Sequence, residues 1–385
     1  MKKAGLIFIV LMILLILLAG PIQAVTIGGE FNLKSSYDFD LDDNVVTTAD
    51  LELNFSRSSF TEAFEVTIGV KDGWPEGETE VSLRDAYFDY YGENYDLRAG
   101  KQLVSWGTAA GYNPTDNINP LNLDDPTDDK DSLLMVRGDY YFDHNYRLTG
   151  ILVPFHQPPL TGTMPLPDTG VEMPQKAGTE LEIEETDYGL SSLEYGLKFS
   201  GRGIAGYDFS FSLYHGHENF PTLRYEETPK DLLPESSYYQ KFTVVGADLA
   251  TDFKGVGFWA EGAYMIPEYR DSYGSLVIGA DYNLPSGQLI LGQLIYQQDR
   301  EGEDNFIIHQ AVEGLFADHH QARIAGFYNL SSGSYLIRPE VEFSLADAVK
   351  FKIDYTYQSG MVLPQGQSSL MEDHNEISAV LSYYF

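Results

Sequence analysis

Histidines are the side chains of this sequence that could most directly do acid–base or nucleophile-assisted chemistry. His215 and His217 share one predicted strand face near a strand end, and His156 lies in a predicted loop. An acyl-transfer enzyme would need a nucleophile, a histidine and an acid clustered at one rim. No nucleophile motif stands beside these residues, and we interpret His319 and His320 as surface residues at a short turn. The sequence therefore predicts no enzymatic activity and no catalytic residues.

The sequence also offers few residues for metal or redox chemistry. The chain has no cysteine, which excludes disulfide frameworks, cysteine-ligated zinc, iron–sulfur clusters and cysteine nucleophiles. An Asp-rich stretch within 106–131 could hold calcium, but the spacing of an EF-hand loop is absent. We predict no metal site and no cofactor, and keep a calcium-stabilised loop as the alternative.

The charge balance is strongly acidic. Asp and Glu number 58 against 24 Lys and Arg, a formal net charge of −34. Phosphate backbones require basic surfaces, so we predict no nucleic-acid partner. Much of the excess lies in two predicted loops, 106–131 and 155–191. A negative mouth would concentrate cations, although acidic surfaces are also common in saline surroundings.

The elements that carry these side chains alternate with a period of two. Ile27, Phe31, Leu33 and Tyr37 alternate with polar neighbours, as strands with one apolar and one polar face do. We expect about eighteen such strands, each about as long as a tilted strand that crosses a bilayer, with sixteen as the alternative. They lie at 26–38, 45–57, 62–71, 79–91, 94–105, 132–142, 145–154, 192–202, 205–217, 238–252, 255–267, 272–284, 286–299, 305–317, 319–330, 333–345, 348–360 and 373–385.

Long and short connections alternate along the chain, which favours a membrane barrel over a sandwich. The long ones lie near 106–131, 155–191, 218–237 and 361–372. Because hydrocarbon cannot satisfy free backbone groups, a spanning sheet must close on itself. We therefore predict an all-β, closed antiparallel transmembrane barrel with both termini in the periplasm, long extracellular loops, and strand-end tyrosines (Tyr90, Tyr95, Tyr146, Tyr207, Tyr282 and Tyr383) in girdles at the lipid headgroups.

The two ends of the chain carry targeting features. Lys2, Lys3 and the apolar run that follows predict a signal peptide at 1–24, cleaved before Val25, with a retained membrane anchor as the alternative. The barrel would then be 25–385. The last strand alternates and ends at Phe385, which resembles the signal read by the barrel assembly machinery of the outer membrane of diderm bacteria.

Strand polarity predicts a lumen of mixed sign, in which most charges pair across neighbouring strands. Lys101 breaks the pattern of its strand, and a bulge near Gly100 would turn it inward. Either of the loops 106–131 and 155–191 could form the constriction. The residues that we predict to line the pore are Arg98, Gln102, Trp106, Asp85, Asp89, Arg137, Asp139, Glu261, Asp281, Arg323, Arg338 and Glu340.

One stretch carries a family resemblance. Residues 97–107, which read Leu-Arg-Ala-Gly-Lys-Gln-Leu-Val-Ser-Trp-Gly, are followed by Asn113-Pro114 and Asn119-Pro120. This resembles a motif of a poorly characterised family of porin-like outer-membrane barrels, and more distantly the alginate-export porins. The resemblance implies a passive outer-membrane channel, and it places Arg98, Gln102 and Trp106 at the pore entrance.

The function that we expect is passive diffusion of small hydrophilic solutes through the cell outer membrane, with a lean towards cations. Its partners would be outer-membrane lipid, the assembly machinery through Phe385, and the solutes; a homo-trimer is the assembly to test, since general porins are usually trimers. The alternatives are a transporter of hydrophobic solutes, an adhesin or structural barrel, and, as the weakest, an outer-membrane hydrolase.

Overall fold

The computed structural model describes 25–40, 45–75, 77, 79–120, 130–157, 182–183, 192–219, 222–227, 232–298, 302–317, 319–360, 362 and 373–385. The predicted signal peptide 1–24 lies outside these residues. No helix among them is long and apolar enough to cross a membrane. The regular elements are β1 Thr26–Asp38, β2 Val45–Ser58, β3 Glu62–Trp74, β4 Glu80–Tyr91, β5 Tyr95–Gln102, β6 Leu133–Tyr141, β7 Tyr146–Val153, β8 Glu182–Ile183, β9 Glu194–Ile204, β10 Tyr207–His217, β11 Thr222–Glu227, β12 Leu232–Tyr238, β13 Lys241–Phe253, β14 Val256–Pro267, β15 Tyr273–Asn283, β16 Leu289–Gln298, β17 Asp304–Phe316, β18 His320–Asn329, β19 Tyr335–Ala346, β20 Val349–Ser359 and β21 Asp373–Tyr384.

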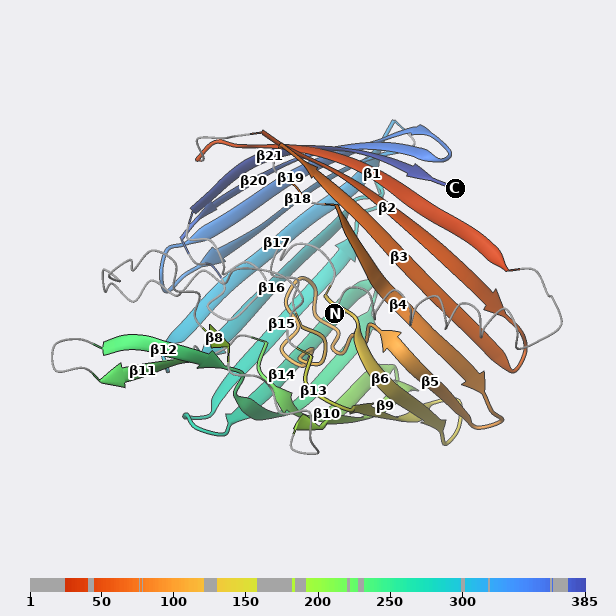
Figure 1. The fold of residues 1–385 in the computed structure, drawn as a ribbon, viewed down its shortest axis with the longest axis vertical. Helices are drawn as coiled ribbons and strands as arrows, with labels where there is room; N and C mark the ends of the chain where they lie inside the picture. The colour runs from red at the N-terminus through yellow and green to blue at the C-terminus, as the bar shows by residue number, and fades with distance from the viewer. Residues whose placement is uncertain are drawn as a thin grey trace.

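Eighteen of these strands form one closed antiparallel sheet (Figure 1). β1 pairs with β2 on one side and with β21 on the other, so the first and last strands of the barrel complete the ring. Every strand of the ring lies within a few residues of a predicted segment. The prediction of about eighteen strands is confirmed, and the alternative of sixteen is wrong. Closure leaves the sheet without a free edge.

The two faces of the barrel differ as the alternation predicts. On β14, Phe258 and Tyr264 are exposed on the outer surface, whereas Trp259 and Glu261 point inward and are buried. The outer surface carries a belt of exposed apolar side chains contributed by most of the strands. Its members include Leu33, Phe88, Leu97, Val136, Leu152, Leu197, Phe211, Val245, Phe258, Leu276, Leu294, Val312, Ile324, Ile337, Ile353 and Leu381.

Aromatic side chains gather where strands end. Tyr90, Tyr95, Tyr207 and Tyr282 are exposed and flank short turns, and Tyr90 and Tyr95 lie with their ring centroids 6.1 Å apart across one of them. This is the placement expected of an aromatic girdle.

The connection near 218–237 contains regular structure that the sequence reading missed. β11 and β12 pair antiparallel there, and β12 pairs in parallel with the two-residue β8, which gives a separate three-stranded sheet. These strands are shorter than a bilayer crossing requires, so a pattern of bilayer-length strands does not detect them. Most of 155–191, 121–129 and nearly all of 361–372 lie outside the described residues.

The irregularity predicted near Gly100 lies instead on the neighbouring strand. β5 pairs with β4 and β6 without a shift of register, although Gly100 has a φ of 134°. The shift occurs in β4, at its pairing with β3. Lys101 stays opposite Ala86, and its ammonium group donates to the carbonyl of Leu83 beside the β4 bulge. The predicted bulge at Gly100 is therefore wrong: β5 keeps its register, and the bulge on β4 places a carbonyl beside the Lys101 ammonium.

Candidate pore constriction

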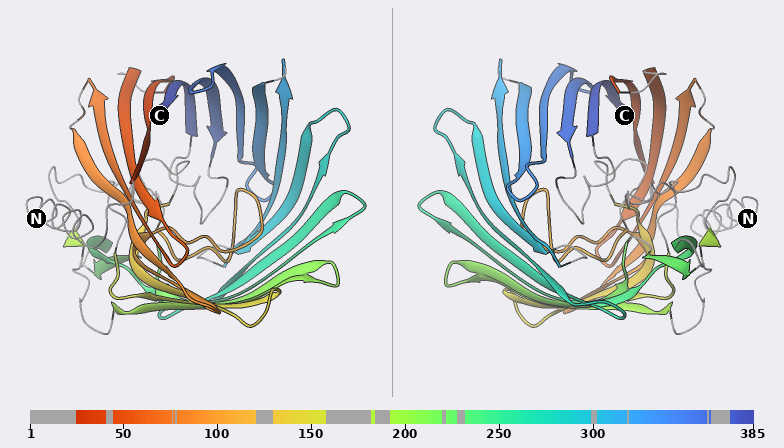
Figure 2. Two further views of the ribbon diagram at one scale, coloured as in Figure 1. Left: turned by 90° about the vertical axis from the view of Figure 1, so that its right-hand side faces the viewer. Right: turned by 90° about the vertical axis from the view of Figure 1, so that its left-hand side faces the viewer.

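The described part of the connection 106–131 turns into the barrel. We call residues 103–120 the infolded loop; it lies within the ring of strands (Figure 2, orange to yellow trace). Asn119, which is fully buried, closes its base. The backbone N–H of Val104 donates to Asn119 Oδ1 at 2.8 Å, and Asn119 Nδ2 donates to the carbonyls of Gln102 and Asp131 at 3.3 and 2.8 Å. Of the two candidate loops, 106–131 thus has its described part inside the barrel, and most of 155–191 lies outside the described residues.

A single carboxylate on β14 anchors the loop to the wall. Glu261 is 1% exposed. Its Oε2 accepts the backbone N–H groups of Thr108 and Ala109 at 2.7 and 3.0 Å. Its Oε1 accepts the backbone N–H and the hydroxyl of Thr115 at 3.0 and 2.9 Å. Four donors offset the desolvation of the buried charge, so Glu261 is a structural anchor.

Gly107 is required where the loop meets this anchor. Its φ is 101°, a conformation that side-chain-bearing residues rarely adopt. A Cβ on Gly107 would lie 2.5 and 2.6 Å from the two carboxylate oxygens of Glu261. The Trp-Gly pair of the sequence motif thus has a physical reason: only glycine lets the backbone approach the carboxylate.

The tip of the infolded loop contacts side chains of β15 and β16. The backbone N–H of Ala110 donates to Gln293 Oε1 at 3.4 Å, and Gln293 Nε2 donates to the carbonyl of Ala110. The Tyr112 hydroxyl lies 3.1 Å from the hydroxyl of Ser275. Burial raises the pKa of Tyr112 to about 12, so its hydroxyl stays neutral near pH 7. The loop therefore contacts three consecutive strands.

An apolar layer fills the space between the infolded loop and the wall. Its loop members are Val104, Trp106 and Ile118, and its wall members are Leu133, Met135, Ile151, Val153, Tyr214, Phe242, Val244, Ala263, Met265 and Tyr273. The inner face is thus not uniformly polar. Segments such as 133–136 are apolar on both faces because one face is on the outer surface and the other lies beneath the loop. In the sequence, this covered patch is marked by short continuous apolar runs inside strands that otherwise alternate between apolar and polar residues.

Three of the predicted pore-lining residues are buried in this arrangement. Gln102 is 0% and Trp106 3% exposed, and Glu261 is held as described above. Gln102 Nε2 donates to the carbonyl of Met135 at 3.2 Å, and Trp106 donates its backbone N–H to Asp116 at 3.2 Å. These three residues support the infolded loop, and their part in lining the pore stays a prediction.

Ion pairs occupy the wall on β4 to β7. Arg98 donates two hydrogen bonds to Asp89, at 2.7 and 2.9 Å, and its guanidinium lies 3.8 Å from the centroid of the Tyr87 ring. Arg137 contacts Asp139 at 2.8 Å. The two carboxylates are largely buried and the two arginines partly exposed, so the side of each pair that remains open to the lumen is basic.

The remaining predicted residues are spread around the wall and form no single ring. Asp85 accepts a hydrogen bond from Ser132 at 2.6 Å. Asp281 lies beside Gly257 on β15 and β14. Three further pairs are long and partly exposed: Arg323 with Glu313 at 3.9 Å, Arg338 with Asp354 at 3.4 Å, and Glu340 with Lys352 at 3.9 Å.

The histidines singled out from the sequence separate into two environments. His215 Nδ1 lies 3.0 Å from the hydroxyl of Thr243. His217 and His156 both contact Glu194. The shared strand face of His215 and His217 did not reveal this cluster, because His156 reaches it from another connection.

No protein-family model and no curated protein matches the sequence. The fold is similar to solved structures from Pseudomonas aeruginosa. OccK5 (OpdH) superposes with a TM-score of 0.60 at 9% identity, covering 95% of this chain and 99% of that one. OprD gives 0.57 at 9% identity over 95% and 96%, and OccK3 (OpdO) gives 0.56 at 11% over 94% and 95%. At these identities the likeness establishes the fold alone, a closed antiparallel barrel of 18 strands.

Proposed function

We propose that this protein is a passive channel in the cell outer membrane for small hydrophilic solutes. The observation that carries the proposal is a closed barrel with an apolar belt outside and paired charges inside. A belt of this extent is unfavourable in water, and a closed sheet is one of the two folds that can span hydrocarbon. A barrel of about this size leaves room for an aqueous path, which the infolded loop narrows. Such a channel needs no chemistry, so we propose no enzymatic role.

We propose that the channel prefers cations. On the inner wall, described bases lie within ion-pair distance of acids, as with Arg98, Arg137 and Arg338, so pairing offsets much of their charge. Acidic residues outnumber basic ones 58 to 24 over the whole chain. The resulting negative field would raise the local cation concentration.

A planar bilayer experiment tests both statements. The refolded protein should give discrete conductance steps, and the reversal potential under a KCl gradient should have the sign for K⁺ preference. The preference should weaken as salt rises, because the Debye length falls from about 10 Å at 0.1 M to about 3 Å at 1 M. Absence of conductance contradicts the channel, whereas anion preference contradicts only the selectivity.

Export and orientation belong to the same proposal. We assign 1–24 to a cleaved signal peptide and 25–385 to the barrel, with the long connections outside the cell and both termini in the periplasm. The likeness of 97–120 to the motif of porin-like and alginate-export barrels is supported by the part that Gly107 and the two Asn-Pro pairs play in the infolded loop.

Assembly is the remaining part of the proposal. The backbone of Phe385 exchanges hydrogen bonds with Gly29 at 2.9 and 3.0 Å, so the terminal residue lies at the seam that closes the ring. Recognition of Phe385 by the assembly machinery would therefore act on a residue of the pairing that closes the ring. Cross-linking in native membranes would show whether barrels associate as trimers.

A further inference from the structure

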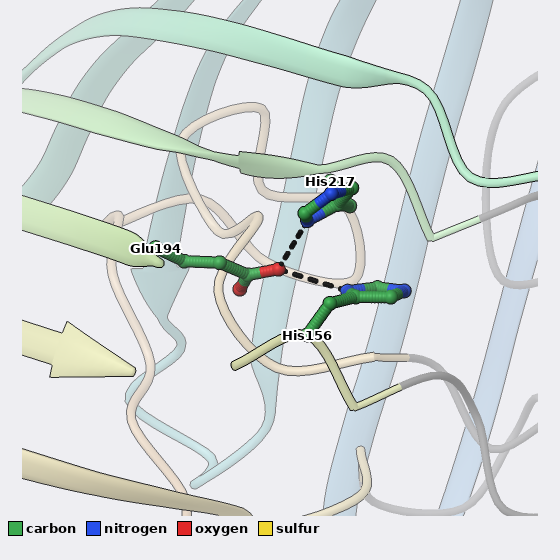
Figure 3. A group of neighbouring side chains, drawn as sticks. All are labelled: His156, Glu194 and His217. Atoms are coloured by element: carbon green, nitrogen blue, oxygen red, sulfur yellow. Dashed lines mark hydrogen bonds and ion pairs between the residues drawn. The ribbon is translucent and has the colours of Figure 1, made fainter. Parts of the chain in front are cut away.

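Three buried side chains capable of binding a metal meet at the barrel end that bears the long connections (Figure 3). His156 follows β7, Glu194 begins β9 and His217 ends β10. β9 pairs with both β7 and β10, so the three residues come from adjacent strand ends. Their exposed fractions are 7%, 2% and 6%. Polar groups this deeply buried need partners of matching chemistry.

The ligand atoms converge on one point. His156 Nδ1 lies 2.8 Å and His217 Nδ1 2.7 Å from the same Glu194 oxygen, Oε1. The two imidazole rings are 4.2 Å apart. One nitrogen from each ring and one carboxylate oxygen all lie within 4.8 Å of one another. This is the spacing from which a single cation could be bound.

A further contact extends the arrangement beyond the three ligand side chains. Tyr214, 2% exposed, donates its hydroxyl to Glu194 Oε2 at 2.8 Å and so orients the carboxylate. Outer partners of this kind commonly orient metal ligands. His156 Nε2 is buried and has no hydrogen-bond partner among the described residues.

We propose that His156, Glu194 and His217 bind one divalent transition-metal ion of the zinc class. Two imidazole nitrogens and one carboxylate oxygen are a ligand set typical of Zn²⁺, with water at a fourth position. Mg²⁺ and Ca²⁺ prefer oxygen ligands alone. Binding would displace the protons now shared with Glu194. Ligand bonds of about 2.0–2.1 Å in tetrahedral geometry would open each N···O separation to about 3.3 Å.

The site would tie the rim to the infolded loop. Tyr214 belongs to the apolar layer that contains Trp106. Trp106 also packs over Gly196, two residues from Glu194, where an added Cβ would lie 2.8 Å from the indole ring. A bound ion would hold the ends of β7, β9 and β10 together and stiffen the wall beneath the loop. The site is defined by side-chain geometry, so zinc binding at it does not depend on whether the barrel conducts ions.

The test uses the full refolded barrel in detergent, freed of metal with a chelator and titrated with Zn²⁺ in a large excess of Mg²⁺. The Mg²⁺ occupies sites made of oxygen alone. We expect one tightly bound zinc per chain. Co²⁺, used as a spectroscopic substitute, should give the visible d–d bands of a nitrogen-ligated site of low coordination number. A wild-type barrel without tight zinc and without these bands overturns the proposal.

Variants separate this site from other histidines and acids. His217→Asn should weaken zinc binding by more than about 100-fold, and Tyr214→Phe by roughly 10- to 100-fold. His215→Asn, on the same strand but bonded to Thr243, should bind as the wild type does. Equal zinc binding by His217→Asn and wild type would also overturn the proposal. If His217→Asn does not fold, the cobalt spectrum of the wild type still decides.

Discussion

At the scale of single residues, the constriction depends on one buried carboxylate. Glu261 accepts all of its hydrogen bonds from a segment about 150 residues earlier in the chain (153 for Thr108). Each hydrogen bond to a charged group contributes about 1.5–3 kcal/mol. By contrast, the partly exposed pair Arg323–Glu313 at 3.9 Å contributes at most about 1 kcal/mol. Glu261 therefore contributes more to holding the infolded loop than such a partly exposed pair contributes to the wall.

Glu261→Gln should loosen that loop. The amide keeps one acceptor but turns an NH₂ group towards backbone donors, so the loss of about 3 kcal/mol raises the detached population roughly 100-fold. We expect higher single-channel conductance and more open-channel noise in planar bilayers. Glu340→Gln removes the same charge from the inner wall, at a residue that contacts Lys352. If the two variants conduct alike, Glu261 is not the anchor.

Gly107→Ala should have a related effect through sterics. The left-handed φ costs about 1–3 kcal/mol with a side chain, and the added Cβ collides with the Glu261 carboxylate. Limited proteolysis of the folded barrel should then cut within 103–120. Gly150→Ala is the matched control, because an added Cβ there meets nothing within 4 Å. Equal resistance of the two variants would show that the loop tolerates the substitution.

At the scale of elements, the infolded loop packs through one apolar layer on six strands of the wall. These strands are β6, β7, β10, β13, β14 and β15. Polar contacts hold it at its base through Asn119, at its middle through Glu261 and at its tip through Tyr112. The apolar layer lies between these points. Docking should therefore be cooperative, and loss of the contact at the tip should free the tip first.

The tip contact predicts a dependence on pH. Burial raises the pKa of Tyr112 from 10.0 to about 12. The neutral phenol therefore contributes stability that is complete below pH 10 and is lost as pH rises from 10 through 12. Conductance of the wild type should increase over this range. Tyr112→Phe has no such ionisation and should lack this part of the increase; superimposable pH profiles would contradict the assignment.

At the scale of the whole molecule, the distribution of apolar and polar side chains over the two faces of the barrel determines which face can contact lipid. Val312 is exposed on the outer belt, and the adjacent Ala311 points into the barrel. If the belt faces lipid, the two positions should respond oppositely to a charge even though they are neighbours in sequence.

Val312→Lys should destabilise the barrel by about 2–4 kcal/mol, the cost of a lysine on a lipid-facing strand near the bilayer centre. Ala311→Lys places the same charge on the inner wall, near Glu313, and should change stability much less. The measurement is the temperature at which the heat-modifiable form disappears in SDS electrophoresis of protein in lipid bilayers. Equal losses for both variants would argue against a lipid-facing belt.

The sequence by itself determined the strands, their approximate ends and the closed antiparallel ring. Alternation is a local property: each side chain's face follows from its neighbours two residues away.

Only the tertiary structure decided that 103–120 folds inward, that Gln102, Trp106 and Glu261 are covered, and that His156, Glu194 and His217 meet. Those outcomes depend on contacts between distant segments, such as Thr108 with Glu261, 153 residues apart. Period-two patterning assigns a residue to a face of the barrel, but it does not reveal what packs against that face.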